Sequence, residues 1–396
     1  MPPLLLGLDE RRQAPLPDLF APIVAYETMT RVAILTPTLT PADAVSNDVL
    51  AMRRVLRERG NEVRIFADNS NVAGEQIDAP AAALSYLRAN DDVLIYHHSI
   101  GCTSGVETMK AASCRKIVKY HNVTPPEFFE GISERHQQLC ESGRAQLKDI
   151  VAAQPDLYLA DSAFNKSDLI VAGSEEHKSF VLPPFNQAGE LLAGEADLEL
   201  FDRYHDESVN LLMVGGVRPN KGHADLIEAF ATYYYNFNAH ARLFVVGAGN
   251  QAFESYAAAL RRLIEEWSID SRIVFTGEVS NESLKSYYLL ADALLMTSEH
   301  EGFCVPLVEA MAMKVPIVAY ASTAIPETVQ DTALIWDERD PYLMAQSIDF
   351  LQTNEVERMA LVYRGSRRYD ENFSHRAIEK RFIELFDSIS AADKRR

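Results

Sequence analysis

The chain has few cysteines and no long apolar segment, although it is 396 residues long. Its cysteines form no C-x-x-C pair and show none of the His/Cys spacings typical of a metal site. They are Cys102, Cys114, Cys140 and Cys304. No apolar run approaches the ~20 residues that a membrane-spanning helix requires. These absences argue against a disulfide-stabilised scaffold and an integral membrane protein, and they predict a reduced, cytoplasmic setting.

Basic charge is also scarce, with 38 Lys and Arg against 57 Asp and Glu and a formal net charge of −19. Such a surface repels phosphate backbones and anionic lipids, so we expect no nucleic-acid partner and, at most, weak peripheral association with the inner face of a membrane. One local exception is the run Arg53, Arg54, Arg57 and Arg59 on a predicted helix. A solvated helix face is the favoured interpretation, and an acceptor or membrane patch is the alternative.

The first 30 residues follow no recognisable pattern. They begin with MPPLLLGLDE, which has no basic segment before its leucines, so the pattern predicts no signal peptide. Pro15-Leu16-Pro17 indicates irregular structure, and residues 23–26 could add an edge strand. We therefore treat residues 1–30 as an N-terminal extension.

From residue 31 onward, short apolar runs alternate with amphipathic segments, which is typical of doubly wound α/β domains. Residues 31–67 predict a strand–helix–strand unit, but no G-x-G-x-x-G motif accompanies it, so a dinucleotide fingerprint is absent. Residues 124–143 predict a loop. Its Phe128 and Phe129 either face an acceptor or, more simply, pack the loop down.

The same alternation divides the chain into two Rossmann-like domains. We predict the first domain over residues 31–190 and the second over residues 208–373. The acidic and weakly patterned segment 186–208 is predicted to link them. An amphipathic C-terminal helix is predicted within residues 374–396.

The most informative pattern lies near residue 300. Residues 293–296 predict a buried parallel strand that ends in Thr297-Ser298, and Pro306 suits the first turn of a following helix. Ligands of such sheets bind at this edge. The free N–H groups and the positive dipole end of the helix favour an anion such as a diphosphate, and Gly302 leaves room for its approach.

Two carboxylates, Glu301 and Glu309, flank this predicted anion site. They lie eight residues apart in the sequence, about 12 Å along a helix, so they could address the two ends of one extended ligand. A nucleotide sugar fits, with its sugar hydroxyls at Glu301 and its ribose hydroxyls at Glu309. Two glutamates at this spacing also arise by chance in doubly wound domains, so the spacing alone leaves the function open.

A second phosphate-binding pattern opens the second domain. The strand over residues 209–214 leads into a glycine turn that ends at Gly222, and a helix follows. Lys221 and Arg218 could neutralise a phosphate there. The pattern is weak by itself, because a lysine beside such a turn is usually only solvated.

Histidines end two strands of the first domain. The strand over residues 93–96 leads into His97, His98 and Ser99, and the strand over residues 117–120 leads into His121. Because the carboxyl ends of parallel strands meet at one edge, we expect a polar cluster in one crevice, on the acceptor side. For His97 and His98, a purely structural role is an equally good interpretation.

The segment E-G-F-x-x-P-x-x-E-A-M, with V-P-I-V-A and Pro326-Glu327-Thr328 after it, resembles a known signature. It is similar to the donor site of the fourth family (group 1) of retaining glycosyltransferases, which have the GT-B fold. The match is strongest from residue 209 to 328, and the resemblance covers most of residues 31–385. It implies two Rossmann-like domains across a cleft, with the donor on the second, the acceptor on the first, and the last helix packed back on the first.

The resemblance also implies roles for single residues. Glu301 would bind the transferred sugar, Glu309 the ribose, and His121 the sugar near its anomeric carbon. Main chain after the first glutamate would hold the sugar and the diphosphate, at Gly302, Phe303, Cys304 and Val305. Main chain near the base would come from the segment between Gly277 and Val279. Lys221 would take the charge of the leaving diphosphate.

Two departures from the family pattern concern phosphate contacts. The family has an arginine five residues before the lysine, where this chain has Gly216. Arg218 could replace it by a different reach. Residues 41–44 read Pro-Ala-Asp-Ala, where family members often have glycine near the donor phosphates.

The resemblance therefore predicts a retaining hexosyltransferase that moves a sugar from a nucleotide sugar to a glycan or glycolipid acceptor in surface polysaccharide synthesis. No D-x-D motif between apolar runs is present, so we expect no obligatory metal or other cofactor. One alternative is a nucleotide-sugar-binding protein without turnover, which the missing arginine favours. The other is a glycoside hydrolase, but its two carboxyls must sit across one bond at roughly 5 to 9.5 Å, which Glu301 and Glu309 on successive turns cannot do.

Overall fold

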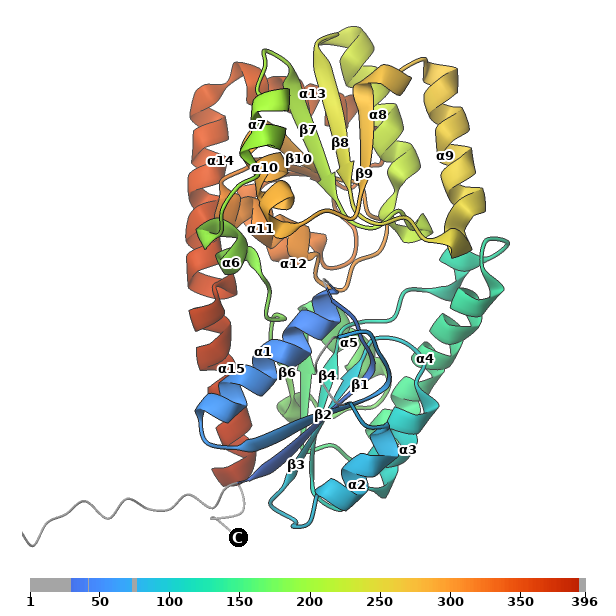
Figure 1. The fold of residues 1–396 in the computed structure, drawn as a ribbon, viewed down its shortest axis with the longest axis vertical. Coiled ribbons are helices and arrows are strands. Elements are labelled where there is room, and N and C mark those ends of the chain that lie inside the picture. Colours follow the sequence, from blue (N-terminus) through green and yellow to red (C-terminus); the bar gives the residue numbers. More distant parts are fainter. Residues whose placement is uncertain (1–29, 42, 73–76, 392–396) are drawn as a thin grey trace, which may run out of the picture.

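The computed structural model describes residues 30–41, 43–72 and 77–391, which form two stacked α/β domains (Figure 1). The predicted N-terminal extension, including the edge strand suggested for residues 23–26, lies outside the described residues except for Thr30. Within the described ranges, no helix combines the length and the apolar character needed to cross a bilayer.

The first domain is built on a six-stranded parallel sheet in the order β2-β1-β3-β4-β5-β6. Its strands are β1 (Arg31–Leu39), β2 (Glu62–Ser70), β3 (Val93–His98), β4 (Arg115–Tyr120), β5 (Leu157–Ala160) and β6 (Ser179–Val181). The helices are α1 (Ala44–Glu58), α2 (Ala83–Tyr86), α3 (Thr103–Ala111), α4 (Glu134–Ala152) and α5 (Ala163–Val171). Strands β3 and β5 are buried along their whole length, because apolar layers cover both faces of the sheet.

The second domain repeats this build with the strand order β12-β11-β10-β7-β8-β9. Its strands are β7 (Val209–Val214), β8 (Ala241–Val246), β9 (Ile273–Gly277), β10 (Ala293–Met296), β11 (Ile317–Tyr320) and β12 (Leu334–Trp336). Its helices are α8 (His223–Asn236), α9 (Glu254–Trp267), α10 (Asn281–Leu290), α11 (Val305–Met313), α12 (Ile325–Val329), α13 (Pro341–Thr353) and α14 (Glu355–Arg368). The prediction of two doubly wound α/β domains is confirmed.

The last helix returns to the first domain. After α14, a short π-helical turn (Tyr369–Phe373) leads into α15 (His375–Ala391), which runs beside α1 in Figure 1. Ile378 and Phe382 of α15 are buried in the same apolar cluster as Val49 and Met52 of α1. The chain therefore crosses between the domains a second time.

Two segments differ from the sequence-based expectation. The predicted linker 186–208 contains α6 (Ala188–Ala193) and α7 (Leu198–Tyr204), and Leu191 packs into the core of the second domain. Each helix is less than two turns long, so neither shows a clear helical period. The predicted loop 124–143 is also wrong in its second half, because α4 begins at Glu134. Its buried face there uses Cys140 and Gly143 instead of large apolar side chains, which hides the periodicity.

Candidate active site

Glu301 lies in the turn between β10 and α11 and forms an ion pair with Lys221. The Glu301 Oε1 atom and the Lys221 Nζ atom are 2.6 Å apart, and Glu301 is only 8% exposed. The N–H of Glu301 donates to Thr323 Oγ1 at 2.8 Å, and that hydroxyl donates to the Glu301 carbonyl oxygen at 2.8 Å. Two residues from different sequence motifs thus meet in one site. The Thr323 hydroxyl fixes both the N–H and the carbonyl oxygen of Glu301.

The helix α11 begins immediately after this turn. Its N-cap residue, Cys304, has the left-handed φ of 75°, and Pro306 stands in the first turn. Burial raises the pKa of the Cys304 thiol well above its ordinary value, so this side chain is a neutral packing group. In the part of the chain that the structure describes, the N–H groups from residue 302 to residue 305 have no hydrogen-bond acceptor. They and the positive end of the helix dipole form a site for an anion.

Glu309 lies in the second turn of α11 and is buried. Tyr288 donates a hydrogen bond from its hydroxyl to Glu309 Oε2 at 2.7 Å. Burial raises the pKa of the Glu309 carboxyl, which the bond from Tyr288 partly opposes. In this structure the carboxylate is held by Tyr288, and the proposed contact with a ribose stays a prediction.

The glycine turn after β7 lies beside Glu301. Gly222 has a φ of 64°, and a Cβ atom on it would lie 2.0 Å from the carbonyl oxygen of Thr297, so only glycine allows this close approach. Arg218 is exposed, and its Nε atom is 3.5 Å from the place of a Cβ on Gly216. The guanidinium therefore folds back over the position where the family has its arginine.

The segment predicted to meet the base follows β9. Gly277 has a φ of 71°, and its carbonyl oxygen accepts the N–H of Gly247 at 3.0 Å. Val279 is half-buried against the apolar core under this edge. The segment is thus placed at the same sheet edge as Lys221, and its contact with a base stays a prediction.

The first domain closes directly on this motif. A Cβ on Gly302 would lie 2.5 Å from the carbonyl oxygen of His121, so the two main chains are in contact. Ser162 Oγ donates to the Gly302 carbonyl oxygen at 2.8 Å, and His300 Nε2 lies 2.9 Å from Asn122 Oδ1. The ends of β4 and β5 thus seat the loop that carries Glu301.

The side chain of His121 points into the first domain. Its Nδ1 atom is 2.9 Å from Asp161 Oδ2, and its Nε2 atom is 2.9 Å from Nδ1 of His97. Both ring nitrogens are therefore occupied, and only the main chain of His121 reaches the motif of the second domain. A contact between its ring and a donor sugar would require the ring to give up a partner.

The expectation that His97 and His98 face an acceptor is wrong. Both are completely buried, and the ring of His98 is bonded to the Gly143 carbonyl oxygen at 2.8 Å and to the hydroxyl of Tyr96 at 3.1 Å. Burial lowers the pKa of His98 to about 4. Ser99, by contrast, is half-buried at the end of this strand. The α3 and α4 helices cover this edge, which a pattern confined to the strands did not reveal.

Three charged residues around His121 were missed by the sequence analysis. Asp48, Lys119 and Asp161 are nearly or completely buried, and the Lys119 ammonium bonds to the Asp161 carboxylate. A signal was present for Lys119, since a lysine within the apolar run Ile117-Val118-Lys119-Tyr120 of a buried parallel strand needs a buried partner. Asp48, His97 and His121 also form a compact group of possible metal ligands within the described residues.

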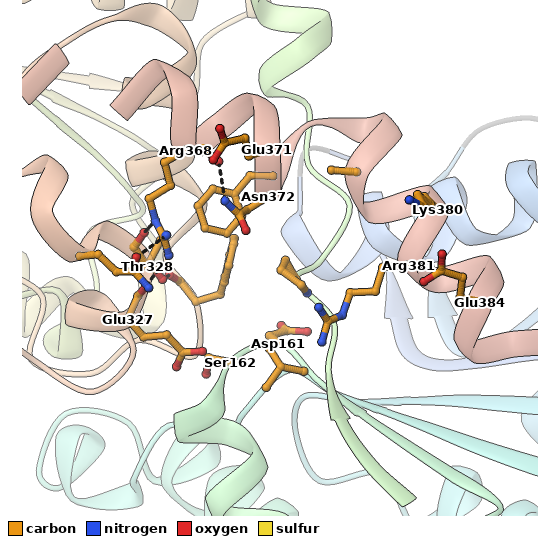
Figure 2. Close-up of a pocket in the computed structure, with 16 residues that line it drawn as sticks. Asp161, Ser162, Glu327, Thr328, Arg368, Glu371, Asn372, Lys380, Arg381 and Glu384 are labelled. Carbon is orange, nitrogen blue, oxygen red and sulfur yellow. Dashed lines mark hydrogen bonds between the residues drawn. The ribbon is translucent and has the colours of Figure 1, made fainter. Parts of the chain in front are cut away.

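A cavity of about 350 Å³ lies between the two domains and the crossover to α15 (Figure 2). Asp161 and Ser162 line it from the first domain, and Phe303 and Glu327 line it from the second. Both Glu327 carboxylate oxygens accept the N–H of Ala163 at 2.7 Å, at the start of α5. Of the site residues predicted from the sequence, Phe303 lines this cavity, while Glu301 and Lys221 lie outside its wall.

Comparison with known proteins identifies the second domain. Residues 202–368 match the model of the family described as glycosyl transferases group 1. This region is similar to members of that family. The described part of the chain has the GT-B fold. It shares this fold with HepE of Anabaena, solved with UDP and glucose, at a TM-score of 0.72 and 16% identity over 91% of this chain and 100% of that chain. Sucrose-phosphate synthase of Thermosynechococcus elongatus has a TM-score of 0.73 and 17% identity over 92% and 100%.

Relatives among curated proteins are more similar but match shorter stretches. The serotype-specific mannosyltransferase WbdA of Escherichia coli is 27% identical over 140 residues, which are 35% of this chain and 17% of WbdA. A GDP-mannose-dependent phosphatidylinositol monomannoside mannosyltransferase of Mycobacterium tuberculosis is 29% identical over 163 residues, 39% of this chain and 41% of that one. The matches thus span 17% and 41% of the length of these two relatives.

Proposed function

We propose that this protein is a glycosyltransferase that moves a sugar from a nucleotide-sugar donor to a glycan or glycolipid acceptor. The observation that carries the proposal is the meeting of Lys221, Glu301 and the start of α11 at one sheet edge, in a domain of the group 1 family. Lys221 and the unpartnered N–H groups suit a diphosphate, and Glu301 suits sugar hydroxyls.

The proposed reaction retains the anomeric configuration and needs no metal. Lys221, with Arg218 beside Gly216, supplies the positive charge that the leaving diphosphate requires, together with the helix end. Relatives that assemble surface glycans support a role in polysaccharide synthesis, and a glycolipid acceptor would bring the protein to the cytoplasmic face of a membrane. The mannosyltransferase relative that uses GDP-mannose and the neighbour bound to UDP make guanosine and uridine donors the first to test.

The test is a panel of GDP- and UDP-sugars incubated with and without candidate acceptors. We expect one nucleotide to raise the melting temperature selectively, and its sugar donor to release nucleotide faster when an acceptor is added. Activity should persist in EDTA, and the product linkage should keep the configuration of the donor. Binding without any nucleotide release would identify a protein without turnover, and release of sugar from an acceptor without nucleotide would identify a hydrolase.

A further inference from the structure

A buried cluster of ionisable groups lies directly behind the first-domain wall of the proposed site. It collects side chains from four elements: α1, β3, β4 and β5. Its members are Asp48, His97, Lys119, His121 and Asp161, each at most 5% exposed at its side chain. Ionisable groups are rarely buried together unless they are paired, so the contacts among these five groups should indicate the net charge of the cluster.

The contacts assign most of the protons. Asp161 is a carboxylate, because it accepts from Lys119 and from Nδ1 of His121, and these partners hold its pKa below the ordinary value against the effect of burial. Lys119 is the ion-pair partner of Asp161, and its amino group also donates to the carbonyl oxygen of Leu182 at 2.5 Å. These two charges cancel.

Asp48 is left without a charged partner at bonding distance. Its Oδ1 atom accepts the N–H of Phe185 at 2.8 Å, but its Oδ2 atom has no hydrogen-bond partner. That oxygen lies 3.6 Å from Nε2 of His121, 3.7 Å from Nδ1 of His97 and 4.0 Å from the Lys119 ammonium. With both histidines neutral, an ionised Asp48 would leave one uncompensated negative charge in the interior, which is costly.

The rings of His97 and His121 do not make this group a metal site. Their planes are 20° apart and their centroids 5.1 Å apart, while the facing nitrogens are 2.9 Å apart. The centroid separation exceeds the nitrogen separation by about one ring diameter, so the rings meet edge to edge with these two nitrogens facing each other. A metal ion bound to Asp48 and to both rings would not lie along the lone-pair directions of the two ring nitrogens. The geometry fits a hydrogen bond between the rings.

We propose that Asp48, His97 and His121 share one additional proton, which neutralises the cluster and makes Asp48 and His97 positioning residues for the ends of β4 and β5. The proton resides on Asp48 or on the histidine pair, and either placement gives a net charge of zero. Burial raises the pKa of Asp48 and lowers that of His97, which favours the carboxyl as the resting place.

The cluster can act on the site because it holds the residues that seat Gly302. Asp161 precedes Ser162, which donates to the Gly302 carbonyl oxygen, and His121 touches Gly302 through its own carbonyl. Loss of the shared proton would place a net negative charge behind both strand ends. Asp161 also lines the inter-domain cavity, where Figure 2 shows Arg381 of α15 reaching toward it, with Lys380 in the same wall. This cavity gives protons a route to the cluster.

The test compares the pH dependence of the parent with that of Asp48→Asn. In the parent, the proton is bound more tightly in the folded state, so stability and proposed donor binding should both fall as pH rises through the folded pKa of the cluster. Asp48→Asn removes the negative charge, so no extra proton is needed. We expect nucleotide affinity to fall about tenfold over the range in which the parent loses the proton, and less than about twofold over the same range in Asp48→Asn.

Two further variants make the result specific. His97→Gln keeps Asp48 but removes one proton carrier, so the alkaline loss should remain and move by about one pH unit. Asp149 of α4 forms an exposed ion pair with Lys110 of α3, and the Asp149→Asn variant should behave as the parent. Identical pH curves for the parent and Asp48→Asn, or a stoichiometric zinc ion in the purified protein, would overturn the inference.

The inference rests on the proposed function only for its effect on the donor. The melting temperatures of the parent and of Asp48→Asn between pH 5 and 10 test the shared proton without any ligand. If no nucleotide binds at any pH while the melting curves behave as expected, only the proposed function would be rejected. The reverse outcome, with nucleotide bound equally at every pH and the same melting curves for the parent and Asp48→Asn, would reject the shared proton alone.

Discussion

The two domains have sheets of the same parallel build but complete their carboxyl edges in opposite ways. The first domain covers its edge with its own ionisable side chains, such as His121 and Asp161, which bond to one another. The second presents glycines and main chain at its edge, as at Gly222 and Gly277, with the ion pair of Glu301 and Lys221 beside them. Side chains that satisfy one another form a rigid wall, whereas unpartnered main chain can accept a ligand. The difference supports the proposal that the second domain binds the donor and that the first positions it.

The largest effect should come from the ion pair of the second domain. Glu301→Gln keeps the shape but loses the charge beside Lys221, and we expect the rate of sugar transfer to fall about 1,000-fold. Steady-state kinetics with the best donor measures it. Glu338→Gln, at an exposed glutamate of the same domain, should leave the rate unchanged. Equal rates in both variants would break the assignment of the reaction to this edge.

Acid should destabilise both domains, because each hides neutral histidines. Burial lowers the pKa of His98, His223 and His300 to about 4. As pH falls below 6.5, these histidines bind protons in the unfolded chain but not in the folded chain, so stability is lost between pH 6.5 and about 4. We expect the melting temperature to fall by about 10 °C over this range.

A single substitution shows whether these histidines cause the acid loss. Among the described residues, neither ring nitrogen of His223 has a hydrogen-bond partner of good geometry, so His223→Leu removes a proton acceptor at little cost in hydrogen bonds. The slope of stability against pH should decrease in that variant. His177→Gln, at an exposed position, should keep the full slope. An unchanged slope in His223→Leu would assign the acid loss to other groups.

A smaller effect should follow from closing the main-chain approach in the second domain. Gly222→Ala would place a Cβ 2.0 Å from the Thr297 carbonyl oxygen at a left-handed φ, and we expect a loss of about 2–3 kcal/mol in the free energy of unfolding. Chemical denaturation measures it. Gly249→Ala is the matched control, because a Cβ there meets nothing within 4 Å. Equal stabilities would show that the turn can move to accommodate a Cβ, and that the close approach of Gly222 to the Thr297 carbonyl oxygen is not required.

The smallest effect should come from Glu309, which already has a partner. Glu309→Gln retains an acceptor for the Tyr288 hydroxyl, so the fold should persist while nucleotide binding weakens about tenfold. Calorimetric titration with the nucleoside diphosphate measures this change. A Tyr288→Phe variant should bind nucleotide at least as well as the parent, since it frees the carboxylate. Unaltered affinity in Glu309→Gln would remove the ribose contact from the proposal.

Local patterns predicted the framework and part of the site. The strand Ala293–Met296 and the helix after it follow from an apolar run, a polar turn and a proline, which are features of neighbouring residues. The resemblance of the second domain to the group 1 family was stated from the same stretch. Short helices such as α6 and the start of α4 were missed, because their buried faces are too short or too small to show a period.

The sequence by itself determined two parallel sheets, the glycines at their turns and a glutamate next to a helix start, since each depends on residues close together in the chain. Only the tertiary structure decided which charged groups meet. Lys221 reaches Glu301 across 80 positions, and His121 meets His97 and Asp161 because strand order places β3, β4 and β5 side by side. Buried charges are governed by which strands become neighbours, and that choice is made by packing of the whole domain rather than by any local pattern.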